Sequence, residues 1–355
     1  MNASTRLTVL SAVGIASIAG AALFASVRAA SGKAETIGVG AQPMTQDEDG
    51  FTLQRRRGSV DLDTAYDMTD LRIPEGEIHT LLPKDAIPAL TDPKRQPASE
   101  AEWLDDESRV VVAEIGGEVL GVPLAVLNWH EVVNTTLGGE PIAVTYCPLC
   151  DSATAFSREV SAPGSDEVEV LEFGVSGALY NSNVLMYDRT HKSLWSQLGM
   201  EAVSGPMSGA KLEMLPMRVM SLGVFKEEHP RAEMVSNDTG HRRNYSVSPY
   251  ERYFSSDSLM VDVKGHGDAL AKKTLGLGVS VGDAAWFVPE NEIGTGMTLQ
   301  TPAGEVVIEP TIGGFEVTSA PEGTRTAQTF YYSWSAFYPQ TEVVDGGDDG
   351  QNAGG

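Results

Sequence analysis

The stretch that decides the fold is RVVVAEIGGEVLGVP, residues 109–123. Two runs rich in β-branched residues flank the Gly116-Gly117 pair, which predicts a β-hairpin. Pro123 then suits the first position of a helix, predicted over residues 124–134. The β-type run 142–146 comes next and leads directly into a pair of cysteines.

The same pattern recurs further along the chain. A strand–Gly–strand–Pro sequence occupies residues 275–289, and residues 225–235 resemble residues 334–344 around a shared aromatic-or-His–Pro–x–x–Glu motif. These matches favour two related β-rich modules, with sub-modules at 108–260 and 270–344. The predicted fold class is α+β with β predominating: short antiparallel strands and a few short helices.

The first thirty residues differ from the rest. A 21-residue segment without charge, Leu7–Val27, fits either a cleaved signal peptide or a retained membrane anchor. Either alternative predicts an exported protein, periplasmic or extracellular, or anchored through this segment alone. The predicted organisation is signal or anchor at 1–30, polar linker at 31–75, globular domain at 76–344 and disordered tail at 345–355.

The amino-acid composition limits the kinds of binding partner that are expected. Acidic residues outnumber basic ones 49 to 25, giving a formal net charge of −24. Such a surface argues against nucleic acid and against docking on anionic lipid. No phosphate-binding loop is present, so no nucleotide cofactor is indicated. Protein partners stay open.

The chain has only two cysteines, Cys147 and Cys150, separated by Pro148-Leu149. A disulfide closing so small a loop would add little stability, so a purely structural role is a weak explanation. A thioredoxin-type pair needs a helix after it, whereas residues 152–160 favour a strand. Two alternatives remain: a metal knuckle for copper or zinc with His130 as a third ligand, or a thiol–disulfide couple.

Other polar residues are candidates for an extracytoplasmic enzyme site. His130 and Glu131 lie on the helix that precedes the cysteine strand, and Asp188 and Gln197 come after it in a polar, aromatic run. These four are the catalytic candidates; Asn181, Tyr187 and Trp195 are the ligand-binding candidates. Asn183 and His191 are assigned to turns. A third hypothesis is a non-catalytic interaction module, in which the same residues only pack.

Several motifs in order resemble the prokaryotic family known as domain of unknown function 3179. They are PKDAIPAL (83–90) with DPK (92–94), HEVVN (130–134), VTYCPLC (144–150), FGVSG (173–177), LMYDR (185–189), SLWSQ (193–197), GP (205–206) and DTG (238–240). The resemblance implies no established activity. The family often has Gly after the second cysteine, where this chain has Asp151.

Overall fold

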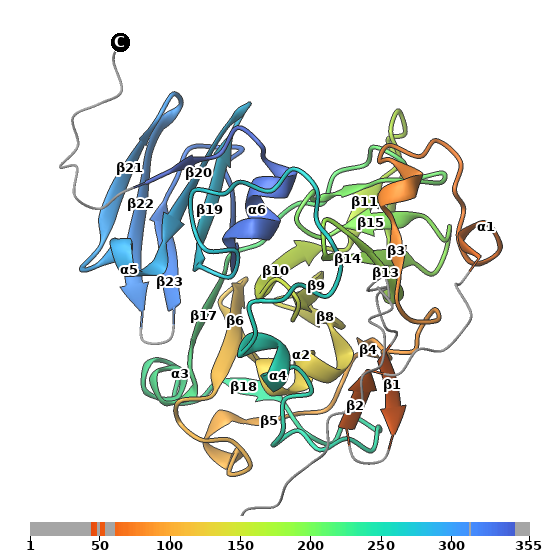
Figure 1. Ribbon diagram of the computed structural model, residues 1–355. Helices are drawn as coiled ribbons and strands as arrows, with labels where there is room; N and C mark the ends of the chain where they lie inside the picture. The colour runs from red at the N-terminus through yellow and green to blue at the C-terminus, as the bar shows by residue number, and fades with distance from the viewer. Residues whose placement is uncertain (1–43, 48–49, 54–60, 312–313, 345–355) are drawn as a thin grey trace, which may run out of the picture. The chain divides into compact units, whose positions relative to one another are not determined.

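The computed structural model describes residues 44–47, 50–53, 61–311 and 314–344 (Figure 1). The predicted signal or anchor, residues 31–43 of the predicted linker and the C-terminal tail lie outside these ranges. In the described part, no helix has the length and apolar character needed to cross a membrane. The first described strands, β1 (Met44–Asp47) and β2 (Gly50–Leu53), pair with each other.

Short, mostly antiparallel strands dominate, which confirms the predicted fold class. The largest sheet of the described residues has the order β25-β20-β19-β24-β10-β9-β8-β4. Its strands are β25 (Glu342–Val343), β20 (Ala284–Pro289), β19 (Leu275–Val281), β24 (Arg325–Phe330), β10 (Ser152–Ser157), β9 (Glu140–Cys147), β8 (Val132–Leu137) and β4 (Leu90–Thr91).

Besides the β1-β2 pair, the described chain contains four smaller sheets. One contains β17 (Met217–Ser221), β6 (Arg109–Ile115), β7 (Glu118–Pro123), β18 (Glu233–Val235) and β5 (Arg95–Pro97). Another contains β16 (Glu201–Ala202), β15 (Leu194–Ser196), β14 (Asn183–Asp188), β13 (Phe173–Tyr180) and β3 (His79–Thr80). The others pair β11 (Glu159–Ser161) with β12 (Val168–Val170), and β21 (Met297–Thr301) with β22 (Gly304–Thr311) and β23 (Gly314–Ser319).

The helices are short. They are α1 (Leu62–Ala65), α2 (Leu124–His130), α3 (Leu222–Glu228), α4 (Glu251–Phe254), α5 (Glu290–Ile293) and α6 (Tyr331–Phe337), with 3-10 turns η1 (Glu75–Glu77) and η2 (Ala98–Glu100). The helix predicted over 124–134 was too long. It ends at His130, because Glu131 takes a positive φ of 57° and Val132 begins strand β8.

The two segments that the sequence singles out as a repeat adopt the same strand arrangement. The first gives the order β17-β6-β7-β18 and the second gives β24-β19-β20-β25. In each, the last pair is parallel and the other pairs are antiparallel. Each central hairpin ends in a proline, Pro123 or Pro289, that caps the next helix. The shared topology supports two related β-rich units.

Residues 61–75, predicted as linker, belong to the folded body. Tyr66 is only 3% exposed, and its hydroxyl donates to the Ser176 carbonyl at 2.6 Å. The Arg72 amide donates to the Val203 carbonyl at 2.8 Å. Leu62 and Ile73 pack against the same apolar cluster. Burial of these side chains fixes a segment whose local sequence shows little periodicity.

Candidate thiol site

The two cysteines sit in a tight turn between neighbouring strands. Cys147 ends β9 and pairs across the hairpin with Ser152, the first residue of β10. Within the turn, the Cys150 amide donates to the Cys147 carbonyl at 3.3 Å. A strand comes after the pair, as predicted, so the pair is not followed by the helix of a thioredoxin-type site. Both thiols are free and buried.

Side chains from the C-terminal part of the chain hold the turn in place. The hydroxyls of Tyr253 and Tyr332 both donate to the Leu149 carbonyl at 2.8 Å. The Cys150 carbonyl accepts from the Thr329 hydroxyl at 2.9 Å and from the Phe330 amide at 2.8 Å. With its carbonyls satisfied, the turn presents its two sulfurs in a fixed geometry.

Asn183 directs an amide N–H at the Cys150 sulfur. Its Nδ2 lies 3.1 Å from the sulfur, and its Oδ1 accepts from the Leu198 backbone amide at 3.2 Å. Because a backbone N–H can only donate, the oxygen of Asn183 must face Leu198 and the NH₂ group must face Cys150. The orientation of this donor is therefore set by the fold.

Gln197 fixes the other side of the same network. Its Nε2 donates to the Ser152 carbonyl at 3.2 Å and to the Thr145 hydroxyl at 3.0 Å. Its Oε1 accepts from Asn183 and from the Ser152 hydroxyl, both at 2.7 Å. Gln197 is fully buried, and all its polar capacity is used here. It orients Asn183 and Ser152 without touching sulfur itself.

The two sulfurs differ in acidity. Burial alone raises the pKa of Cys150, but side-chain hydrogen bonds outweigh it and lower that pKa below its usual value. The side chains that direct a hydrogen at this sulfur include Cys147, Asn183 and Ser333. Burial, and next the hydrogen bond and charge of Cys150, raise the pKa of Cys147 well above its usual value. Of the two sulfurs, Cys150 therefore loses its proton more readily than Cys147.

Glu131 is a buried acid beside the thiol pair. It caps the C-terminal end of α2, and its backbone holds φ 57° and ψ −30°, a conformation that a non-glycine residue rarely adopts. Burial raises its pKa to about 8, opposed by a hydrogen bond from the Tyr250 hydroxyl and assisted by the charge of Cys150. The Tyr250 hydroxyl lies 3.4 Å from Oε1. Such strain and such a pKa together are typical of functional sites.

His130 lies next to Glu131 in sequence, yet both its ring nitrogens have protein partners. Nδ1 donates to the Pro88 carbonyl at 2.7 Å, so Nε2 accepts from the Tyr245 hydroxyl, also at 2.7 Å. Tyr245 in turn shares a 2.6 Å hydrogen bond with Thr239. Burial is the main cause that lowers the pKa of His130 to about 4. The imidazole is neutral at physiological pH and ties α2 to two loops.

Asp151 occupies the position where the resembling family often has glycine. Its φ is 48°, in the left-handed region that glycine favours. Its carboxylate accepts from the Tyr146 hydroxyl at 2.8 Å and from Arg109 Nη1 at 3.0 Å. Asp151 therefore anchors the turn to β6 and β9, and its carboxylate is turned toward Arg109.

The remaining candidates fall into different surroundings. Asp188 is fully buried and accepts from the Trp195 indole at 2.9 Å and from backbone amides of the following turn. The Tyr187 hydroxyl donates to Asp85 at 2.5 Å. The Asn181 side chain donates to the Ala336 carbonyl at 3.2 Å. Of the predicted set, the structure brings Cys147, Cys150, Glu131 and Gln197 into one site; Asp188 and Trp195 hold a turn together.

The predicted metal set does not converge. Within residues 61–311 and 314–344, no group of three or more His, Cys, Asp or Glu side chains is close enough to hold an ion. His130 could offer Nε2 only by displacing the Tyr245 hydroxyl. The copper or zinc ion stays a prediction, and it now depends on the two sulfurs themselves.

The sequence pattern misses three important residues of the site. Asn183 fits a turn by its neighbours, and nothing local marks Ser152 or Tyr250. In the structure Asn183 begins an apolar strand and is only 1% exposed. A buried polar residue at a strand end is the signal that identifies it, but burial is not visible in the sequence.

Residues 84–317, well over half of the chain, match the family model described as "Protein of unknown function (DUF3179)". The chain belongs to this family. The DUF3179 match contains α2, the cysteine turn and Asn183, and it ends within β23, so α6 with Tyr332 and Ser333 lies beyond it. No curated protein and no solved structure matches the chain.

Proposed function

We propose that this DUF3179 protein is a thiol–disulfide redox protein whose working pair is Cys147 and Cys150. The observation that carries the proposal is the asymmetry of the pair. Cys150 receives an oriented N–H from Asn183 at 3.1 Å, whereas burial raises the pKa of Cys147 well above its usual value. A hydrogen-bonded thiolate next to a protonated thiol is the arrangement that thiol–disulfide exchange requires.

The exchange with an external disulfide takes two steps. The Cys150 thiolate attacks one sulfur of the external disulfide, forming a mixed disulfide and releasing a thiolate that takes up a proton. Cys147 then gives its proton to Glu131 and attacks the Cys150 sulfur. The second external thiolate leaves and takes the proton from Glu131. In sum, the protein dithiol becomes a disulfide and the external disulfide becomes two thiols.

Glu131 suits the role of proton acceptor because its pKa of about 8 lies near the working pH. A carboxylate with an ordinary pKa would be a weaker base toward a thiol. Glu131 and Cys147 influence each other's charge, which supports proximity. In this proposal the strained backbone of Glu131 keeps its carboxyl group at the thiol pair instead of in solvent.

Access to the buried sulfurs requires a local opening. The segment from Tyr250 to Val263 contributes apolar side chains to the cluster that buries the pair. Tyr253 ties this segment to the cysteine turn, and Lys273 donates to the carbonyls of Tyr253 and Ser256 at 2.5 Å. We infer that this covering segment moves when a partner disulfide reaches Cys150.

The test is a redox titration of the folded chain. The reduced protein is equilibrated in glutathione buffers of increasing oxidation, trapped with an alkylating reagent and weighed by mass spectrometry. We expect reversible conversion to one intramolecular disulfide, and its loss in Cys147→Ser and in Cys150→Ser. In Cys147→Ser, a mixed disulfide with glutathione should accumulate at Cys150, because the resolving thiol is missing.

Two outcomes would overturn the proposal. If both thiols resist glutathione until the protein is denatured, they are inert core residues, as the interaction-module hypothesis requires. If the reduced protein instead retains copper or zinc that Cys147→Ser releases, the pair is a metal site, since thiolates favour soft ions. An enzyme built on His130, Asp188 and Gln197 would keep its activity in both cysteine variants.

A further inference from the structure

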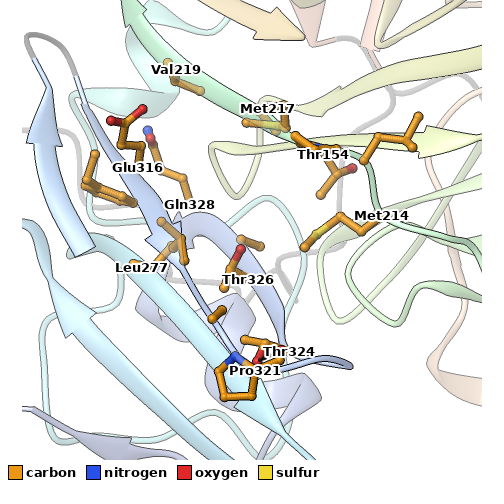
Figure 2. A pocket seen from close by; sticks show the side chains of 17 residues that line it. Thr154, Met214, Met217, Val219, Leu277, Glu316, Pro321, Thr324, Thr326 and Gln328 are labelled. Carbon is orange, nitrogen blue, oxygen red and sulfur yellow. Dashed lines mark hydrogen bonds between the residues drawn. The ribbon is translucent and has the colours of Figure 1, made fainter. Parts of the chain in front are cut away.

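A second site lies on the opposite face of the large sheet from the cysteines. It is a pocket of about 270 Å³ where β17 of the first repeated unit and β24 of the second approach β10 (Figure 2). Its rim is formed by Ala320, which is exposed, and by Pro321 and Thr324, which are half-buried. Most of its wall is apolar: Met214, Met217, Val219, Leu277, Phe315 and Val317. This volume is just below the usual range of about 300–1,000 Å³ for ligand pockets.

Gln328 is the notable polar residue of this wall. It is 6% exposed, and neither its Oε1 nor its Nε2 has a hydrogen-bond partner among the described residues. Its strand position explains why. In the sheet it pairs with Ala153 and Leu277, which have no polar side-chain atoms. The next residue, Thr329, contacts the cysteine turn instead.

A buried amide without a protein partner is costly unless a ligand or water supplies the missing hydrogen bonds. The same fold satisfies another buried glutamine, Gln197, at both ends. The unpaired amide edge of Gln328, with one donor and one acceptor side by side, is complementary to a group that offers an acceptor and a donor in the same spacing.

Charge around the pocket argues against an anionic ligand. Glu316 lies on its wall close to Gln328 (Figure 2). Its carboxylate forms an ion pair with Arg218 at 3.0 Å, so this arginine is not free to bind an anionic ligand. The chain as a whole carries a net charge of −24. A neutral ligand avoids repulsion from Glu316 and needs no unpaired cation.

We propose that this pocket binds a small neutral molecule carrying a carboxamide or lactam group. The ligand carbonyl accepts from Gln328 Nε2 and its N–H donates to Oε1. Its apolar part lies against Leu277, Phe315 and Met214. The proposal does not depend on the redox chemistry of the cysteines, since the pocket shares no side chain with that network.

The experiment compares three probes of similar shape on the full chain: benzamide, benzoate and ethylbenzene. Binding is measured by saturation-transfer NMR and by chemical-shift titration. Benzamide is expected to bind at least tenfold more tightly than ethylbenzene, and benzoate is expected not to bind. This comparison uses the unaltered protein, so it does not depend on whether any variant folds.

A variant then assigns the binding to Gln328. Gln328→Met keeps the volume and removes the amide, so benzamide should bind at least tenfold more weakly and ethylbenzene more tightly. Gln300→Met, at an exposed strand position, is the control and should bind all probes as the parent does. Equal binding of benzamide and ethylbenzene, no binding of benzamide, or unchanged benzamide binding in Gln328→Met would each overturn the proposal.

Discussion

The two repeated units share a frame and differ in the segment that comes after their central hairpin. In the first, Pro123 leads into the seven-residue helix α2, then to Glu131 and to the strands that deliver Cys147. In the second, Pro289 leads into the four-residue α5, then to Gly294 and a plain three-stranded sheet. The candidate thiol site lies in the segment that follows the first of these hairpins (Figure 1).

The two repeated units also differ in the residue that ends the helix after the hairpin. Both α2 and α5 end on a residue with positive φ, 57° at Glu131 and 54° at Gly294. Glycine adopts such a backbone without penalty, whereas glutamate is strained there. The second unit thus has glycine, Gly294, at this position. The first unit has Glu131, whose backbone is strained and whose buried carboxyl group lies beside the two thiols. Strain at a repeated position is therefore a pointer to function.

The units also share a packing device. The fourth residue of the closing helix is aromatic in both, Phe225 in α3 and Trp334 in α6, and it packs on a strand glycine. Phe225 covers Gly121 of β7, whereas Trp334 covers Gly278 of β19.

The largest expected loss of stability comes from substitutions at these two glycine–aromatic contacts. A Cβ at Gly278 would lie 2.1 Å from Trp334 Cδ2, and one at Gly121 would lie 2.7 Å from Phe225 Cε1. We expect Gly278→Ala to lower the free energy of unfolding by about 3 kcal/mol and Gly121→Ala by about 1–2 kcal/mol, because overpacked cores must distort. Urea denaturation measures both. Gly76→Ala, with open space around it, should stay within about 0.5 kcal/mol; equal losses at all three would refute the packing argument.

The next effect is the pH dependence that Glu131 brings to the first unit. Its pKa is about 8 when folded against 4.5 as the ordinary value. The folded chain therefore binds more protons between these values, so this residue's contribution to stability falls as pH rises from about 4.5 to about 8. Glu131→Gln removes this loss of stability. The free energy of unfolding of the variant should therefore exceed that of the parent by on the order of a few kcal/mol at pH 8, but not at pH 5.

Urea unfolding of both proteins at the two pH values, under reducing conditions, measures that difference. His130, whose pKa falls to about 4, gives a slope of opposite sign below pH 6.5. Its effect is common to both proteins and cancels when they are compared. A pH-independent difference between parent and Glu131→Gln would show that the carboxyl group is not titrating across this range.

A smaller effect should separate Asn183 from its neighbour Asn181. Asn183→Leu removes the N–H that faces the Cys150 sulfur, so the pKa of Cys150 should rise. Alkylation of Cys150 at neutral pH, which follows the local opening that exposes it, should slow by roughly tenfold. Asn181→Gly keeps the positive-φ backbone and does not touch sulfur. Its alkylation rate should match the parent; equal slowing in both variants would contradict a specific role for Asn183.

The smallest effect tests the glycine at the second helix end. Gly294 has φ 54° and ψ −118°, so Gly294→Ala should cost about 1 kcal/mol from backbone strain alone. Thermal unfolding would measure it, and redox behaviour should be unchanged because Gly294 lies in the unit without cysteines. A stability gain instead would mean that the backbone there relaxes without penalty.

By itself, the sequence determined the hairpin at residues 109–123, the β-rich class and the repeat, and it singled out the cysteine pair as the candidate site. These depend on local alternation, on turn residues and on spacing, which a linear pattern carries. It also excluded a thioredoxin-type helix after Cys150, because residues 152–157 favour a strand. The helix predicted over residues 124–134 was too long, because the β-branched Val132-Val133 pair belongs to strand β8 of the sheet.

Only the tertiary structure decided which polar residues belong together. Gln197 and Asn183 join Cys150 across strands that are distant in sequence, while His130 and Asp188 are satisfied by backbone and hydroxyl partners elsewhere. The unpaired amide of Gln328 is likewise invisible before its sheet neighbours are known. Hydrogen bonding and desolvation depend on three-dimensional neighbours. The sequence could name the two sulfurs, and only the fold could show that the Asn183 amide faces Cys150.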